Sequence, residues 1–287
     1  LTVGSSQFST FGSIVLQGKL LNDTVEWEYG SRSPYETIND IQFEDGQIWI
    51  TTVGQGLWSV DPEQRLILPT PSSLHYQMDG IVIDGQKMYV GLMGQDGSSA
   101  GFQSFNLDDR TWGSGSLIAG LPSNIVTDFV EFGDHILVAT HGGIGLWNTS
   151  KSDWDDPITT ADGLTSPTIN HLLVPPSPIL GNGTVLTGGP NGINVLDAQL
   201  NYLISIDRSD GLIGNSVAGM VYADAATTFV TDPITGNNLS IHHGASIFIS
   251  HDGLGASSRP GVVAWDLDTN RVNGTYNIDM IPSNDVR

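Results

Sequence analysis

The chain contains no cysteine among its 287 residues. This absence excludes a scaffold held by disulfides and a thiol nucleophile. Basic residues are also scarce, because 10 Lys and Arg stand against 31 Asp and Glu and leave a formal net charge of −21. A surface this acidic repels the phosphates of nucleic acids and of anionic membranes. We therefore expect no nucleic-acid partner.

Long hydrophobic runs and catalytic motifs are missing as well. No apolar run approaches the roughly 18 residues of a membrane span, so we expect no membrane insertion in this segment. The Gly-x-Ser-x-Gly turn of hydrolases and the His-Glu-x-x-His zinc motif are both absent. Ser250, His251 and Asp252 are consecutive, whereas the members of a catalytic triad converge from separate parts of a chain. The sequence therefore predicts no catalytic residue and no metal ligand.

Glycine is abundant, with 35 copies, and six of them recur in one pattern. Each of the six stands four residues before a large apolar residue that ends a short strand-like run. The first five apolar residues follow one another at intervals of 42 to 49 residues, and the last comes 69 residues later. A repeat of this length, built from short strands, is typical of the blade of a β-propeller, which is an all-β fold. The pairs are Gly12 and Leu16, Gly54 and Trp58, Gly101 and Phe105, Gly143 and Trp147, Gly192 and Leu196, and Gly261 and Trp265.

The repeat divides the chain into blades, which we expect to form a single propeller domain over residues 1–287. Each blade has an inner strand, a second strand buried between neighbouring blades, a third strand and a weaker outer strand; the third complete blade has its first three at 124–132, 135–140 and 144–148. The fifth is lengthened by an insertion at about 225–244, which we expect to form a loop. The five complete blades cover about 31–77, 78–120, 121–164, 165–212 and 213–280.

The two ends of the chain are expected to share a sixth blade. Residues 1–30 have the pattern of a second, a third and an outer strand. Residues 281–287 match the start of an inner strand at 121–126. One inner strand and three others make a whole four-stranded blade, which is how propellers close their ring. The sequence thus predicts six blades, with seven blades or an excerpt from a longer array as the alternatives.

The links into the inner strands carry a family resemblance. Asp162-Gly163-Leu164-Thr165-Ser166-Pro167 is one such link, and second strands such as Ile136–Thr140 precede a Gly-rich turn. This pattern resembles the two-component-regulator propeller repeat over nearly the whole chain. The resemblance implies an extracytoplasmic sensor-type propeller, and some members of that family recognise polysaccharide fragments. The second strand at 184–187 departs from the family pattern because it has no aromatic residue, and the link at 279–281 lacks Gly-Leu.

Candidate ligand-binding residues lie where turns and links of a propeller share one face. The turns between second and third strands and the links into inner strands of this chain are rich in amides and imidazoles, which suit hydroxyl-rich or peptide ligands. Turn geometry alone is the alternative explanation, because Asn and Gly cap turns and tolerate positive φ. The candidates are Gln55, Gln95, His141, His171, Asn191 and His251.

Other notable residues have mainly structural interpretations. Trp58, Trp147 and Trp265 recur at one position of the repeat, which indicates packing between blades. Trp112 and Trp154 could form exposed stacking surfaces or pack on outer strands. The segments 106–109 and 266–270 have the spacing of calcium ligands without a complete loop, so Ca²⁺ is the one cofactor that the sequence leaves open.

The sequence favours an extracellular or cell-surface propeller that binds or displays without catalysis, with a glycan or a protein as the ligand. Five Asn-x-Ser/Thr sequons agree with an exported protein. Two alternatives belong to other classes. One is a lyase or glycoside hydrolase with His141, His171 or His251 as the base, and the other is the ligand-sensing domain of a longer receptor. The oligomeric state is not predicted.

Overall fold

The computed structural model of the chain is built almost entirely of β-strands. It describes residues 2–5, 14–21, 24–32, 38–44, 47–52, 56–60, 65–67, 77–93, 99–113, 119–176, 183–223, 226–231, 238–251, 261–267 and 271–277. Within these residues no helix is long and apolar enough to cross a membrane. The chain divides into two compact units, and we treat each in turn.

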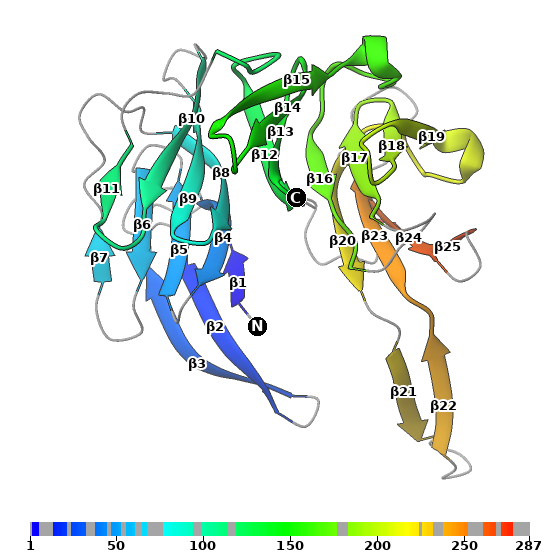
Figure 1. Ribbon diagram of the computed structural model, residues 1–287. Helices are drawn as coiled ribbons and strands as arrows, with labels where there is room; N and C mark the ends of the chain where they lie inside the picture. Colours follow the sequence, from blue (N-terminus) through cyan, green and yellow to red (C-terminus); the bar gives the residue numbers. More distant parts are fainter. Residues whose placement is uncertain are drawn as a thin grey trace. The chain divides into compact units, whose positions relative to one another are not determined.

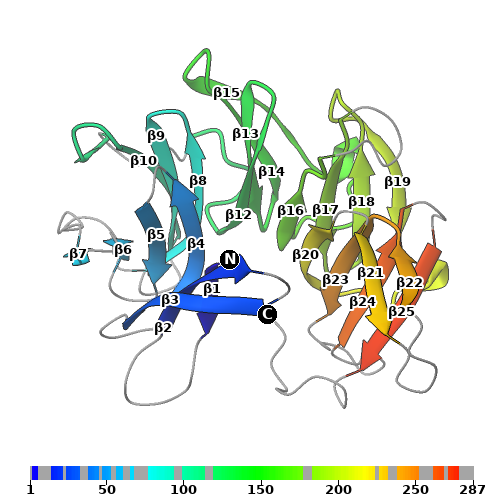
Figure 2. The same ribbon diagram turned by 90° about the horizontal axis from the view of Figure 1, so that it is seen from below.

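The first unit comprises residues 1–141 and 145–157 and contains four antiparallel sheets (Figures 1 and 2). Their strands follow one another in chain order across each sheet. The sheets are β1 (Thr2–Ser5), β2 (Ile14–Leu21) and β3 (Thr24–Arg32); blade 1, with β4 (Ile38–Glu44), β5 (Gln47–Thr52), β6 (Gly56–Val60) and β7 (Arg65–Ile67); blade 2, with β8 (Gln77–Asp84), β9 (Lys87–Met93), β10 (Ser99–Asn106) and β11 (Thr111–Trp112); and blade 3, with β12 (Val126–Phe132), β13 (His135–Thr140), β14 (Gly143–Asn148) and β15 (Asp153–Ile158).

The second unit comprises residues 142–144 and 158–287 and contains two further blades and a hairpin (Figure 1). The insertion predicted to be a loop instead forms a two-stranded hairpin that extends from blade 5. The elements are blade 4, with β16 (His171–Leu173), β17 (Val185–Gly189), β18 (Gly192–Leu196) and β19 (Tyr202–Ile206); blade 5, with β20 (Val217–Ala223), β23 (Ser246–His251), β24 (Gly261–Asp266) and β25 (Arg271–Asn277); and the hairpin β21 (Ala226–Thr231) and β22 (Asn238–His243).

The architecture is that of a β-propeller, as predicted, but the number of blades differs. The described residues form five four-stranded blades, whereas the sequence predicted six. The strands β1, β2 and β3 make a sheet of three. Residues 281–287, which were expected to add its fourth strand, lie outside the described residues.

The core lies in the second and third strands of each blade. In blade 3 every residue of β14 is buried, while the outer strand β15 is largely exposed or half-buried. Phe102 of blade 2 and Phe129 and Trp147 of blade 3 belong to one apolar cluster, so strands buried on both faces join successive blades. Each large apolar side chain buried in this way contributes roughly 1.5–3 kcal/mol to the free energy of unfolding.

Small residues in the second strand make room for the following blade. A Cβ on Gly91 would lie 3.0 Å from the ring of Phe129, and one on Gly188 would lie 2.6 Å from Cγ1 of Val217. The inner strand of one blade therefore packs directly on the backbone of the second strand before it. The residues at this position of the second strand are Thr51, Gly91, Ala139, Gly188 and Ser250.

Polar bonds also tie successive inner strands. The Asp40 carboxylate in blade 1 accepts hydrogen bonds from the N–H of Ile41 at 2.7 Å and from the N–H of Ile81, in blade 2, at 2.9 Å. In blade 4, Asn170 donates from Nδ2 to the carbonyl of Val217, in blade 5, at 2.8 Å. A single side chain thus bridges two blades in each unit.

The Asp-Gly-Leu links have one conformation. Asp162 and Asp210 each end a short 3₁₀ turn, and their carboxylates accept hydrogen bonds from the backbone N–H of the preceding N-cap residues. The glycines that follow have φ of 110° and 115°, in the left-handed region that only glycine adopts readily. The next residues, Leu164 and Leu212, are buried. The motif is therefore a capped turn that anchors the chain in the core.

Candidate functional site

We define the rim of a blade as the turn between its second and third strands together with the link into its inner strand. In blade 3 the rim contains His141, which follows β13, and Asn124 in the link. Both residues are exposed. The N–H of His141 donates to the carbonyl of Ile125 at 3.1 Å, so turn and link are joined by backbone while the two side chains remain available to solvent.

The rim of blade 4 is held by side chains as well as backbone. The exposed Asn191 donates from Nδ2 to the carbonyl of Thr165 at 2.7 Å, and the N–H of Thr165 donates to Oδ1 of Asn194 at 3.1 Å. The N–H of Gly192 donates to the carbonyl of Asn215, in the next link, at 2.7 Å. These bonds fix polar groups of two successive links and one turn in a rigid surface. The amide of Asn191 therefore takes part in holding the turn.

The two remaining described candidates lie deeper. His171 is the first residue of β16 and is half-buried. His251 is the last residue of β23 and is completely buried, with Nδ1 3.1 Å from the carbonyl oxygen of Ser216. It occupies the position that Thr52 and Thr140 hold at the ends of the second strands of blades 1 and 3. Gln55 and Gln95 lie outside the described residues.

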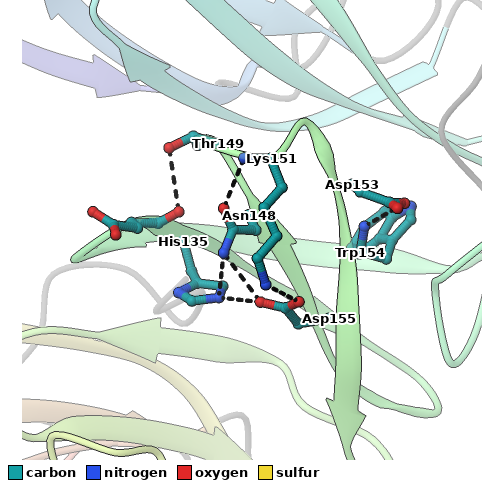
Figure 3. Close-up of polar contacts among 8 residues, drawn as sticks. His135, Asn148, Thr149, Lys151, Asp153, Trp154 and Asp155 are labelled. Carbon is teal, nitrogen blue, oxygen red and sulfur yellow. Dashed lines mark hydrogen bonds and ion pairs between the residues drawn. The ribbon is translucent and has the colours of Figure 1, made fainter.

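Blade 3 also carries a polar cluster that the sequence did not single out (Figure 3). His135 Nε2 lies 2.8 Å from Oδ2 of Asp155, and Lys151 Nζ lies 2.7 Å from its Oδ1. Asn148 donates from Nδ2 to Asp155 at 3.1 Å and accepts the N–H of Lys151 through Oδ1 at 3.0 Å. These four residues come from the start of β13, the end of β14, the following turn and β15.

The neighbours of Asp155 in this cluster stabilise its negative charge. The Lys151 ammonium first, and then His135 and Asn148, hold the pKa of the Asp155 carboxyl far below its usual range. A carboxylate stabilised in its charged form is a poor proton acceptor, so the arrangement ties three strands together and does not suit a general base. Asn148 starts a sequon. The residue is only 6% exposed, and both Nδ2 and Oδ1 of its side chain form hydrogen bonds, so this sequon is not accessible to glycosylation in the folded chain.

In the first segment with calcium-like spacing, polar side chains form hydrogen bonds within the turn. Asn106 Oδ1 accepts the N–H of Asp108 at 2.9 Å and of Asp109 at 3.3 Å, and Asp109 Oδ1 accepts the hydroxyl of Thr111 at 2.6 Å. Within the part of the chain that the structure describes, no group of three or more His, Asp or Glu side chains is placed to hold a metal ion. Residues 268–270 of the second such segment lie outside that part.

The outer-strand tryptophans pack rather than stand free. The Trp112 ring lies 5.0 Å from the ring of Phe105, and Trp154 lies 5.4 Å from Trp147. A Cβ on Gly120 would collide with Trp154, whose ring therefore lies directly on the link into its own blade. Outer-strand packing explains both residues.

Comparison with known proteins supports the fold. No protein-family model matches the chain, and no curated protein matches its sequence. The computationally designed Ika8 protein is similar in structure, with a TM-score of 0.54 and 13% identity over 93% of this chain and 82% of that chain. The extracellular domain of a putative hybrid two-component system from B. thetaiotaomicron is similar with a TM-score of 0.52 and 14% identity. That match covers 84% of this chain and 36% of the other.

Proposed function

We propose that this chain is an extracellular, non-catalytic β-propeller that binds a glycan at the rim of its blades. The observation that carries the proposal is the rim itself. Exposed amide, imidazole and hydroxyl groups recur on turns and links whose backbone is held by hydrogen bonds, as at Asn124 and His141 in blade 3 and Thr165 in blade 4. A backbone held in this way presents polar side chains to the hydroxyls of a sugar with little loss of backbone entropy on binding.

Two further observations support it. A structure of similar fold is the extracellular domain of a two-component system protein. The Asp-Gly-Leu links carry the resemblance to two-component-regulator propeller repeats. The links at Asp162 and Asp210 both form a 3₁₀ turn with the same capping hydrogen bonds. Both observations support the proposal that the chain belongs to that repeat family and lies outside the cytoplasm.

The proposal includes a single propeller domain with a sixth blade, to which the sheet β1–β3 and residues 281–287 both contribute. The sequence of 281–287 matches the link and inner-strand start at 121–126, and the sheet β1–β3 has three strands where the other blades have four. His251 is left out of the proposed contact surface because it is fully buried. Gln55, Gln95 and His171 stay within it as proposed contacts.

An array of polysaccharide fragments tests the binding role. We expect the wild-type chain to bind a subset of glycans and N124A/H141A to bind them at least tenfold more weakly, since both side chains are exposed. The matched control, E131Q/S150A, alters two exposed residues elsewhere on the same blade and should bind like the wild type. Equal binding by N124A/H141A and wild type would contradict a rim site in blade 3. Peptide binding without glycan binding would contradict the ligand class.

A further inference from the structure

The outer strand of blade 4 concentrates exposed apolar surface. Tyr202, Leu203 and Ile204 in β19 are 36%, 46% and 49% exposed. Among the described residues, the one other exposed large hydrophobic side chain is Val221. β19 is the last strand in the order β16-β17-β18-β19, so no described strand pairs with its outer edge. In Figure 1 it lies at the margin of its sheet, away from β16.

The outer strand of blade 3 gives a direct comparison because contacts with its own blade identify the equivalent residues. A Cβ on Gly143 would lie 2.3 Å from the carbonyl oxygen of Ile158, and one on Gly192 would lie 2.3 Å from that of Ile206. Ile158 and Ile206 are thus equivalent. Each is followed at once by the N-cap of a 3₁₀ turn.

This equivalence reveals a difference in edge protection. Charged side chains and proline are the usual means by which an edge strand avoids pairing with another chain. The strand β15 has both and the strand β19 has neither. In order, β15 carries Asp155, Asp156 and Pro157 where β19 carries Leu203, Ile204 and Ser205.

A bulge makes the contrast sharper. The register between β18 and β19 shifts at Leu203, which is the extra residue of the outer strand. The outer strands β3 and β25 shift at the equivalent place, where the extra residues are Glu28 and Asn273. A bulge is itself one of the devices that protect an edge strand, and all three strands have it. They differ in the extra residue, which is polar in β3 and β25 and apolar in β19.

Carboxylates stand at both ends of this apolar strand. Asp197 precedes it and accepts the N–H of Asn201 at 2.8 Å, and Asp207 follows it and accepts the N–H of Ser209 at 2.6 Å. Hydrogen bonds from Asn201 lower the pKa of Asp197, and those from Ser209 lower the pKa of Asp207. Both are therefore charged at neutral pH, within a chain of net charge −21.

We infer that β19 is a docking edge for an extended segment of another protein, with apolar side chains in its centre and basic residues at its flanks. The segment adds a fifth strand to blade 4 through backbone hydrogen bonds, and its side chains cover Leu203 and Ile204. Basic flanks meet Asp197 and Asp207. A second copy of this chain fits less well because its own β19 brings the same carboxylates.

A synthetic peptide tests the inference. The probe is Lys-Thr-Val-Thr-Val-Thr-Lys with blocked ends, and its partner replaces both Lys by Glu. We expect the Lys peptide to slow hydrogen exchange at the amides of residues 202–206 and the Glu peptide to bind at least tenfold more weakly. L203D/I204D, which installs the residues of blade 3, should abolish the protection. L203T/I204T should weaken binding without adding charge.

The control V221D places one charge on the other exposed apolar residue and should leave peptide binding unchanged. Equal binding by the Lys and Glu peptides, or equal loss in V221D, would overturn the inference. So would a dimer in sedimentation that L203D/I204D abolishes, because the occupant would then be a second copy. Slow exchange without peptide at those amides of 202–206 that face away from β18 would also overturn it, since the chain itself would then cover the edge. L203D/I204D should still bind glycan, which would show that the edge of β19 and the rim are separate surfaces.

Discussion

At the scale of single residues, the links are fixed by a glycine that supports an aromatic ring. Gly163 has φ of 110°, and a Cβ there would lie 2.9 Å from the ring of Tyr202. A Cβ on Gly120, in the preceding link, would likewise collide with the ring of Trp154. Gly163 is thus required for two separate reasons, backbone conformation and close approach, whereas close approach alone applies at Gly120.

Replacing Gly163 by alanine should lower the free energy of unfolding by about 2 kcal/mol, because a strained φ and a displaced ring both oppose the methyl group. Urea unfolding measures the change. The control is Gly133→Ala, whose φ is 60° but whose Cβ would meet nothing within 4 Å, so it bears the backbone strain alone at about 1 kcal/mol. A larger loss in Gly133→Ala than in Gly163→Ala would contradict the role given to the ring.

Asp155 makes stability depend on pH in a defined direction. Because its pKa is lowered in the folded state, its stabilising effect is complete above the usual Asp value of about 3.9 and is lost as the pH falls below it. We expect Asp155→Asn to lower the urea midpoint at pH 7 and pH 5, with the difference from wild type shrinking toward pH 2. The exposed neighbour variant Asp156→Asn should show a smaller difference at pH 7. A gap between Asp155→Asn and wild type that does not change with pH would rule out the ion pair as its cause.

At the scale of elements, the blades are joined by packing that leaves no room and by side chains that cross between inner strands. Phe129 packs against the backbone at Gly80 and Gly91, and Asp40 bridges blades 1 and 2. Both devices lie where the inner strand of one blade meets its neighbour. Blades held in this way unfold together with their neighbours.

Asp40→Ala should therefore lower the free energy of unfolding by about 1–3 kcal/mol, because it leaves the backbone N–H groups of the half-buried Ile41 and the buried Ile81 without this acceptor. Chemical denaturation followed by tryptophan fluorescence measures the loss. Asp40→Asn keeps one acceptor oxygen and should lose less. If Asp40→Ala unfolds at the same denaturant concentration as the wild type, the bridge does not hold the blades.

The sequence predicted most strands but few of the contacts between them. The strands at 135–140 and 192–196 have the predicted bounds because their apolar runs end at glycine turns. The hairpin β21–β22 was missed because an insertion interrupts the repeat and the repeat was the signal. The cluster around Asp155 was missed because its members are spread over three strands and only register brings them together. The burial of His251 was missed because a strand end can face either the core or solvent.

At the scale of the whole molecule, an acidic β-propeller carries two surfaces of different chemistry. The rims present exposed polar side chains on a backbone held by hydrogen bonds, as at His141, while the edge strand β19 presents apolar side chains between carboxylates. The first suits a sugar and the second an extended protein segment. A binding module that joins a glycan to a protein partner would need both.

The most direct test of the central claim is native mass spectrometry of the chain with the glycan that binds best on the array. We predict a complex in which the bound glycan keeps its full mass after overnight incubation, and a complex at least tenfold less abundant for N124A/H141A. Shortened or unsaturated glycan products would contradict the account, because the chain would then be a hydrolase or a lyase rather than a binding module.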